Sequence, residues 1–212
     1  MLTPATATRR RGRPPRGGEH PVDTRERLLR IGLEVLTEKG FAATGLDEIL
    51  GRAKVPKGSF YHYFESKEAF GLELIDRYAG YFAHKLDSHF GNRNLPPLAR
   101  LDEFVADAMA GMARFDFRRG CLIGNLGQEM GALPESFRTR LVAVFMDWEA
   151  RLAACLDAAR SAGQIPADAD CGQLATAFWI GWEGAVLRAK LERSAQPLES
   201  FARFFVSRLP VG

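Results

Sequence analysis

Apolar residues recur at steps of three or four along most of this chain, and this period constrains the fold more than any other feature. Such a period places apolar side chains on one face of a helix, whereas a half-buried strand needs strict alternation. No stretch alternates in that way. The sequence therefore predicts an all-α fold, with helices at about 23–39, 66–90, 98–115, 122–130, 135–162, 171–193 and 198–209 around two shorter ones described next.

Residues 23–64 predict two helices, a turn and a short third helix. The first helix ends at Gly40, and the second is expected to begin at Thr44 with Asp47 completing a capping box. Pro56 lacks an amide hydrogen and suits the first turn of the third helix. This order matches the helix-turn-helix plan, in which the last helix enters the major groove of DNA.

The short third helix carries an unusual set of side chains. Phe60 and Phe64 stand four residues apart and are expected to share one buried face. The remaining face presents a cation, hydroxyl groups and rings, from Lys57, Ser59, Tyr61 and His62. A solvated surface helix would not explain this combination, whereas contact with DNA would.

The segment from Gly40 to Phe70 resembles the DNA-binding domain of the TetR family of bacterial transcriptional regulators. The resemblance rests on Gly40-Phe41, on Thr44, and on the string Lys-Gly-Ser-Phe-Tyr-His-Tyr-Phe-x-Ser-Lys-Glu at 57–68. It implies that the major groove is faced by Lys57, Gly58, Ser59, Tyr61 and His62. It implies phosphate contacts by Thr44, Tyr63 and Lys67. Phosphate would repel the carboxylate of Asp47, which is therefore interpreted as a capping residue only.

Positive charge is concentrated near the N-terminus. Residues 1–64 hold 12 Lys and Arg against 7 Asp and Glu, whereas the other 148 residues carry a net charge of −2. Residues 1–18 contain five arginines and no acid, and are expected to form a disordered arm that enters the minor groove of A·T-rich DNA. The alternative is a solvated tail without a role. Deleting residues 1–18 would then leave operator affinity and its salt dependence unchanged.

The predicted organisation is a basic arm at 1–18, a helix-turn-helix DNA-binding domain at 19–66, and a ligand-sensing and dimerisation domain at 67–212. No apolar run has the length of a signal-peptide core or a membrane span. Three cysteines without a Cys-x-x-Cys spacing argue against a disulfide framework or a zinc site. We therefore expect a cytoplasmic protein that needs no metal or other cofactor.

The end of the chain is rich in apolar side chains. These are Phe178, Trp179, Ile180, Trp182, Val186 and Leu187 on the penultimate helix, and Phe201, Phe204, Phe205 and Val206 on the last. The family resemblance implies that these helices pair with those of a second copy. Two-fold symmetry would then place two recognition helices about 34 to 36 Å apart on a palindromic operator.

Cys121 is the candidate sensor among the three thiols. It follows Arg118 and Arg119 and lies near a helix start, and both conditions are expected to stabilise its thiolate. The alternative is a small buried hydrophobic residue. Asn125 is expected on the same helix face as Cys121, with Gln128 and Glu129 continuing that face.

A second cluster lies on the penultimate helix. Steps of four, three and four place Trp179, Glu183, Val186 and Lys190 on one face, with Trp182 beside them. Both segments resemble those of a TetR subgroup that senses small electrophiles, oxidants or unsaturated acids, in which residues matching Cys121 and Lys190 are the implied sensor pair. The predicted ligand-binding residues are Cys121, Asn125, Glu129, Trp179, Trp182, Glu183 and Lys190.

The function predicted from these features is a repressor that a small-molecule inducer releases from DNA. A noncovalent sensor with a structural Cys121 is the first alternative. A cysteine-nucleophile enzyme would need a nearby imidazole, and none of the four histidines, His20, His62, His84 and His89, is well placed by sequence. An architectural DNA-binding protein would explain the arm but not the tryptophan-containing second domain.

Overall fold

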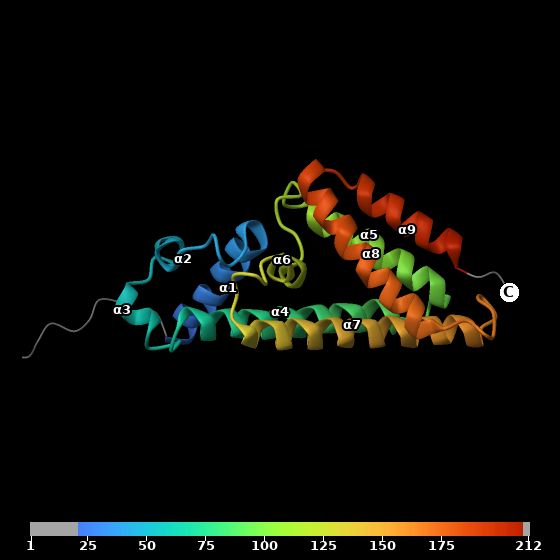
Figure 1. Ribbon diagram of the computed structural model, residues 1–212, viewed down its shortest axis with the longest axis horizontal. Helices are drawn as coiled ribbons and strands as arrows, with labels where there is room; N and C mark the ends of the chain where they lie inside the picture. The colour runs from blue at the N-terminus through green and yellow to red at the C-terminus, as the bar shows by residue number, and fades with distance from the viewer. Residues whose placement is uncertain (1–20, 210–212) are drawn as a thin grey trace, which may run out of the picture.

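A computed structural model describes residues 21–209, so the predicted basic arm lies outside the described residues. Within that range the chain forms nine helices and no strand, as predicted (Figure 1). The helices are α1 (Pro21–Lys39), α2 (Leu46–Ala53), α3 (Lys57–Phe60), α4 (Lys67–Phe90), α5 (Pro97–Ala113), α6 (Leu122–Gln128), α7 (Glu135–Ser161), α8 (Cys171–Glu192) and α9 (Gln196–Arg208). None of them is long and apolar enough to cross a membrane.

The first three helices form a small unit around one end of α4. Phe60 and Phe64 are buried, as predicted, and their rings lie 5.4 and 4.7 Å from that of Phe70 in α4. Aromatic pairs at such distances add to the free energy gained by burial alone. The four-residue helix α3 is therefore fixed to the connecting helix by its own apolar face.

The predicted capping box at the start of α2 is wrong. The N-cap is Gly45, and no side chain caps the helix. The Thr44 hydroxyl instead donates to the Gly40 carbonyl oxygen at 2.6 Å, in the tight turn that follows α1. Asp47 is exposed and forms an ion pair with Lys57 of α3, with 3.2 Å between oxygen and Nζ. Asp47 therefore contacts the recognition helix rather than capping its own.

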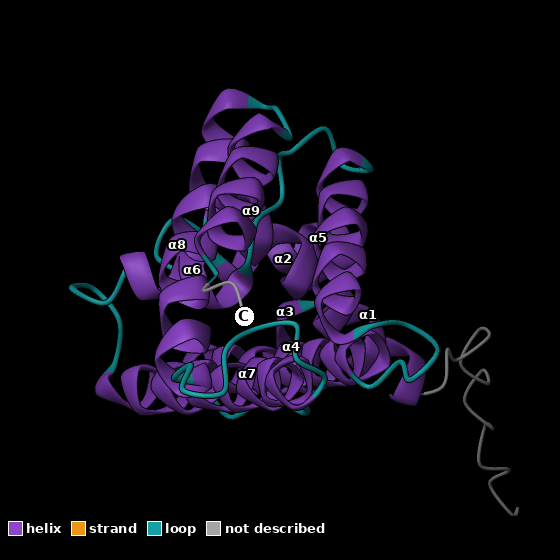
Figure 2. Ribbon diagram, turned by 90° about the vertical axis from the view of Figure 1, so that its right-hand side faces the viewer, coloured by secondary structure: helices purple, strands orange, loops and turns teal. Residues whose placement is uncertain are grey.

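Helix α4 joins this unit to the rest of the molecule. It begins after Ser66, whose hydroxyl accepts from the Ala69 amide at 3.0 Å and so caps the helix that was predicted from residue 66. It lies beside α7 along the length of the molecule, and α5, α8 and α9 stack over this pair (Figures 1 and 2). The core between these layers is aromatic, with the rings of Phe82 and Trp179 lying 4.5 and 5.0 Å from that of Trp148.

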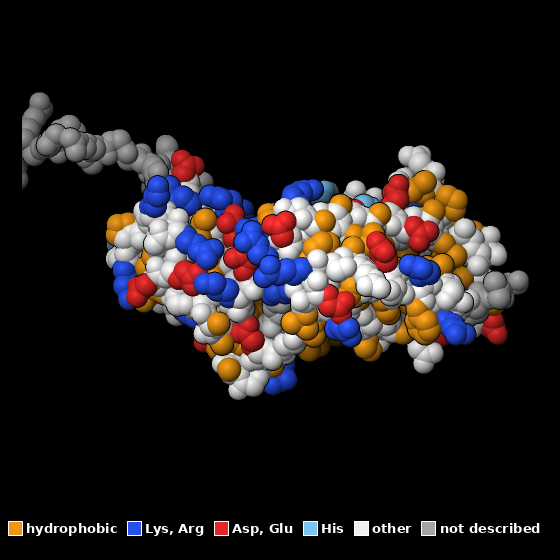
Figure 3. Space-filling view, turned by 90° about the horizontal axis from the view of Figure 1, so that it is seen from above, with side chains coloured by type: hydrophobic (Ala, Val, Ile, Leu, Met, Phe, Trp, Pro, Cys, Tyr) orange, Lys and Arg blue, Asp and Glu red, His pale blue; other side chains and the backbone are white. Residues whose placement is uncertain are grey.

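The apolar residues of the last two helices divide between the core and the surface. Phe178, Trp179 and Trp182 are buried inside this chain, so they are not available to a second copy. A smaller set stays exposed, with Ile180 and Leu191 on α8 and Phe204 and Val206 on α9. Ile180 and Leu191 are 72% and 70% exposed and stand three helical turns apart on one face. Figure 3 shows charged side chains gathered towards the end that carries α1, and more hydrophobic ones towards α9.

Candidate functional site

A cavity of about 1010 Å³ lies between α1, α4, α5, α8 and the loop before α6. Its apolar walls include Leu33, Phe82, Met112, Trp182 and Val186. Charged side chains, among them Lys85, Asp107 and Arg119, line other parts of it. Small-molecule sites combine apolar walls with polar groups that orient the ligand, and this cavity offers both.

Three polar groups meet in the cavity wall, from Tyr78 of α4, Cys121 before α6 and Glu183 of α8. Cys121 is the N-cap of α6, and its Sγ accepts from the Gly124 amide at 3.5 Å. The carboxyl of Glu183 packs so closely on this turn that a Cβ at Gly124 would lie 1.9 Å from one of its oxygens. The absence of a side chain at Gly124 therefore makes room for the acid beside the thiol.

Enclosure changes how these groups titrate. Burial raises the pKa of Cys121 well above its usual value, and the neighbouring carboxyl of Glu183 raises it further. Burial also raises the pKa of Glu183 to about 7, although a hydrogen bond from the Cys121 thiol opposes this change. The pKa of Tyr78 is raised well above its usual value, chiefly by burial. At neutral pH the site therefore holds a neutral thiol beside a carboxyl that titrates far above the usual range of a glutamate.

The predicted stabilisation of the Cys121 thiolate by two arginines is wrong. Arg119 pairs with Glu38 at 3.2 Å and with Glu34 at 3.6 Å, and Arg118 points to Asp116 at 3.8 Å. The two cations are thus engaged by carboxylates, while the charged group beside the thiol is Glu183. Glu183 is far from Cys121 in the sequence, so only the fold reveals that the pKa of Cys121 is raised rather than lowered.

The predicted ligand residues separate into three groups. Cys121, Trp182 and Glu183 line the cavity. Trp179 is 1% exposed and belongs to the aromatic core. The remaining three, Asn125, Glu129 and Lys190, do not line the cavity and bind the end of α1 instead.

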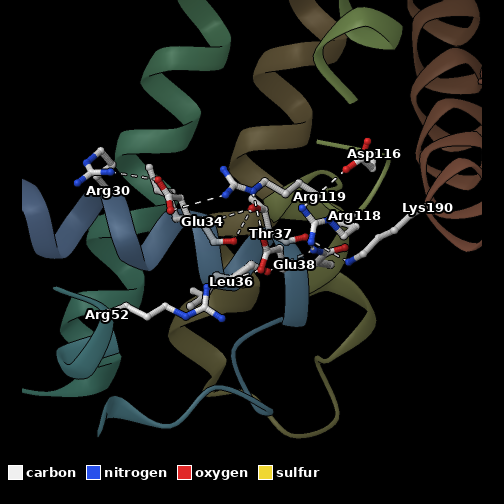
Figure 4. A network of polar contacts seen from close by, with 12 residues as sticks. Arg30, Glu34, Leu36, Thr37, Glu38, Arg52, Asp116, Arg118, Arg119 and Lys190 are labelled. Atoms are coloured by element: carbon white, nitrogen blue, oxygen red, sulfur yellow. Dashed lines mark hydrogen bonds and ion pairs between the residues drawn. The ribbon is translucent and has the colours of Figure 1, made fainter. Parts of the chain in front are cut away.

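The last carbonyl groups of α1 receive donors from the second domain (Figure 4). The Thr37 carbonyl oxygen accepts from Asn125 Nδ2 at 2.9 Å, from the Gly120 amide at 3.1 Å and from Lys190 Nζ at 3.2 Å. Asn125 Nδ2 also lies 3.3 Å from the Leu36 carbonyl oxygen. A helix end leaves carbonyls without intrahelical partners, and a cation is favoured there. Burial lowers the pKa of Lys190.

Glu129 binds the chain immediately after α1. Its carboxylate accepts from the Phe41 amide at 3.0 and 3.1 Å and from the Ala42 amide at 2.7 Å. Gly40 has φ +83°, and a Cβ there would lie 1.6 Å from a Glu129 oxygen. Glycine is thus required at position 40 both by the backbone and by the carboxylate. We call the contacts that Gly120, Asn125, Glu129 and Lys190 make with residues 36–42 the α1 clasp.

Two side chains predicted to bind phosphate are used inside the protein. Lys67 Nζ donates to the Phe41 carbonyl oxygen at 2.9 Å and lies 4.2 Å from the centre of the Phe41 ring. Burial lowers its pKa. Thr44 is 1% exposed, and its hydroxyl is bonded within the turn. The Thr44 hydroxyl is therefore enclosed, whereas Lys67 is half-buried and uses one of its three donors, so its phosphate contact stays a prediction.

The other predicted DNA contacts lie on or near the surface. Lys57, Gly58, Tyr61 and His62 are exposed, and Tyr61 reaches 55%. Ser59 and Tyr63 are half-buried. The exposed groups lie on α3 or in the turn directly after it, while Phe60 and Phe64 of the same segment are buried. Their contacts with DNA remain a prediction.

Sequence reasoning missed several residues of the cavity. Tyr78 and Phe82 lie in the helix predicted at 66–90 but were not among the predicted site residues, yet both line the cavity and their rings stack 5.8 Å apart. Leu33 and Thr37 of α1 also line it, which no local pattern indicated. The tyrosine hydroxyl on an otherwise apolar face was the one available signal. In the described part of the chain no cluster of side chains suits a metal ion.

Comparison with known proteins identifies the class. Residues 28–74 match the model of bacterial regulatory proteins of the tetR family, and residues 97–205 match the tetracyclin repressor-like C-terminal domain. The transcriptional regulator AcuR of Cereibacter sphaeroides is 56% identical over 92% of this chain and 89% of its own length. The repressor NemR of Escherichia coli is 35% identical over 84% of this chain and 89% of its own.

A crystal structure of a TetR regulatory protein from Rhodobacter sphaeroides has the same fold, with a TM-score of 0.86 and 55% identity over 88% of this chain and 98% of that one. The fold and the matched domains define a helix-turn-helix transcriptional regulator. The chain belongs to the TetR family. This membership agrees with the prediction that it is not an enzyme. His84 and His89 do line the cavity, but the polar groups that contact Cys121 are Tyr78 and Glu183.

Proposed function

We propose that the protein is a cytoplasmic transcriptional repressor that binds a palindromic operator as a homodimer. It is released when a small unsaturated acid, electrophile or oxidant enters the cavity at Cys121. The observation that carries this proposal is the position of the cavity, whose wall includes both Cys121 and Thr37 of the DNA-binding half. The names of the relatives support it, since they include a regulator and a repressor.

The site supplies the groups that a covalent response to an unsaturated acid needs. Glu183, with a pKa of about 7, can accept the proton of the Cys121 thiol. The sulfur then forms a bond to the β-carbon while the carbon–carbon double bond opens. The proton passes from Glu183 to the α-carbon, so the acid returns to its starting state. Because the pKa of the Cys121 thiol is raised, little thiolate is present before the ligand binds. The step is therefore slow unless Glu183 takes the thiol proton as the ligand binds.

Noncovalent sensing is the second candidate, and the high pKa of Cys121 favours it. Here the neutral form of Glu183 donates a hydrogen bond to the carboxylate of the ligand, and Cys121 serves only as the cap of α6. An anionic ligand would then bind together with a proton. Its affinity would fall as pH rises through 7, because ionised Glu183 repels a second carboxylate.

Cys121→Ser distinguishes the two modes. If sensing is covalent, the variant should bind the operator like the wild type. The factor by which acrylate weakens its operator binding should be at least about tenfold smaller, because a serine hydroxyl is a far weaker nucleophile. Gel-shift titrations with acrylate and with hypochlorite would measure release, and mass spectrometry would detect the adduct. Cys155→Ser is the matched control, since that buried thiol lies apart from the cavity. If acrylate releases Cys121→Ser from the operator as it releases the wild type, sensing is noncovalent.

Lys57 offers a test of the DNA-binding surface. Lys57→Met should weaken operator binding and reduce the slope of log affinity against log salt by about 0.9, the value for one phosphate contact. Fluorescence anisotropy at several salt concentrations would measure both. Arg93→Met, in the loop that follows the end of α4 opposite to α3, removes the same charge from an exposed site and should leave the slope unchanged. An unaltered slope for Lys57→Met would remove Lys57 from the phosphate contacts.

The domain boundaries complete the proposal. An arm at 1–18 adds salt-dependent affinity, residues 19–66 bind DNA, and residues 67–212 bind the ligand and the second copy. The exposed aliphatic face of α8 and the exposed Phe204 of α9 support pairing through these two helices.

A further inference from the structure

The α1 clasp has properties that a purely structural helix cap would not need. The capping groups come from residues 120–190, far along the chain, and all of them bind main-chain atoms of residues 36–42. Three donors share one carbonyl oxygen at Thr37, which has only two lone pairs. The three hydrogen bonds therefore compete, and a small movement of one donor changes how the others bind.

The same segment forms part of the cavity wall. Thr37, Arg119, Gly120 and Cys121 all line the cavity, and Gly120 is itself a donor of the clasp. A Cβ added at Gly120 would lie 3.4 Å from the side chain of Lys190, so the lysine stem packs on this residue. A ligand that displaces residues 119–121 must move at least one donor away from Thr37.

Beside the α1 clasp, ion pairs connect the cavity wall to α2, the helix before the recognition helix. Glu38 Oε1 lies 3.2 Å from Arg119 Nε in the cavity wall, and Glu38 Oε2 lies 3.7 Å from Arg52 Nη1 of α2 (Figure 4). Arg52 is bound in turn by Glu48 at 2.8 Å, and Glu48 binds Lys39 at 2.6 Å. The last turn of α1 and helix α2 are therefore fixed to each other by ion pairs, and Glu38 also pairs with Arg119, which lines the cavity.

We infer that Asn125 and Glu129 are positioning residues, which hold the DNA-binding domain in its operator-binding orientation through the α1 clasp and transmit ligand binding to it. The inference rests on the proposed function for the identity of the signal, but not for the effect of the clasp on DNA binding. The α1 clasp acts on the end of α1. Helix α4, which runs between the two domains, is a separate connection. Coupling requires an element with two arrangements, and in this inference the second arrangement is the one in which a donor has left the shared Thr37 carbonyl.

Two variants test the inference on the full-length dimer. Asn125→Leu removes the donor at nearly constant volume, and Glu129→Gln removes the charge that binds two amides. Each should weaken binding to an operator selected from random DNA by about fivefold, since a loosened domain must be ordered on binding. The salt slope should stay unchanged because the phosphate contacts remain intact. Hydrogen exchange at the amides of Phe41 and Ala42 should be faster in Glu129→Gln.

Gln128→Leu is the matched control, because this exposed neighbour on α6 takes no part in the clasp. It should behave as the wild type in every measurement, and near-ultraviolet circular dichroism would confirm that all variants fold. Wild-type operator affinity in both Asn125→Leu and Glu129→Gln would overturn the inference. A loss that Gln128→Leu shares would overturn it as well.

Acrylate is the probe for the ligand step. In the wild type it should weaken operator binding, and in both clasp variants the ratio of affinities without and with acrylate should be at least about fivefold smaller. Binding of acrylate itself, measured by calorimetry, should be within about twofold of the wild type, since coupling rather than affinity changes. An unchanged ratio would overturn the clasp as the route. A wild type that acrylate does not release would contradict the proposed ligand class, and the operator-affinity test would still decide the clasp.

Discussion

Glutamate in place of both Ile180 and Leu191 is expected to give a monomer that binds a palindromic operator at least about 100-fold more weakly than the wild type. The two side chains are among the most exposed large apolar groups in the described structure, and they share one face of α8. If that face is covered by a second copy, each glutamate would have to lose its hydration without a cationic partner, which strongly disfavours association.

Loss of the dimer reduces operator affinity because the two half-sites are no longer bound by one molecule. Sedimentation velocity would give the oligomeric state, and titration with a full operator and with a single half-site would give the two affinities. Ala106→Glu introduces the same charge at an exposed position of α5 and should remain dimeric. A double variant that stays dimeric would locate the interface away from α8.

Glu183→Gln is expected to stabilise the protein at alkaline pH. The folded-state pKa of Glu183 is about 7, compared with 4.5 for an unperturbed glutamate, so folding favours the protonated form. Its contribution is fully favourable below pH 4.5, is lost as pH rises towards 7, and is absent above that. Glutamine stays neutral throughout, so the variant avoids this loss. The difference approaches about 3 kcal/mol as an upper limit and is nearer about 1 kcal/mol where cavity water screens the charge.

Urea denaturation at pH 5 and pH 8, at one fixed protein concentration, would measure the effect, because the unfolding of a dimer depends on concentration. The unfolding free energies of wild type and Glu183→Gln should differ little at pH 5 and clearly at pH 8. Glu103→Gln on α5 is the control, since this glutamate is exposed and lines no cavity. If the unfolding free energies of wild type and Glu183→Gln differed by the same amount at pH 5 and pH 8, Glu183 would be ionised in the folded protein at both pH values.

The helices could be predicted closely because their signals are local. The periodic apolar face, Ser66 before α4 and Gly40 after α1 all act within a few residues of the boundary that they set. The capping box at Thr44 failed for the same kind of reason. A hydroxyl can bond the preceding turn as readily as the following helix, and here it binds the Gly40 carbonyl.

The candidate site was predictable only in part. Cys121, Trp182 and Glu183 were found because an unusual composition marks their segments, and the fold places them on one cavity. For Lys67, Asn125 and Lys190 the sequence did not show the main-chain oxygens that they bind, because a polar side chain can bind either a ligand or a distant main-chain group. Helical spacing shows which residues share a face but does not show what that face contacts.

The α1 clasp contacts main-chain atoms only, so it does not depend on the side chains of the domain that it holds. Gly40 is the exception, since a side chain there would collide with Glu129. The DNA-binding domain can therefore change the side chains that face its operator without losing these main-chain contacts with the sensor domain. Evolution can vary the two specificities separately. An exchange of this domain between related regulators should succeed when the glycine and the backbone turn that follows it are kept.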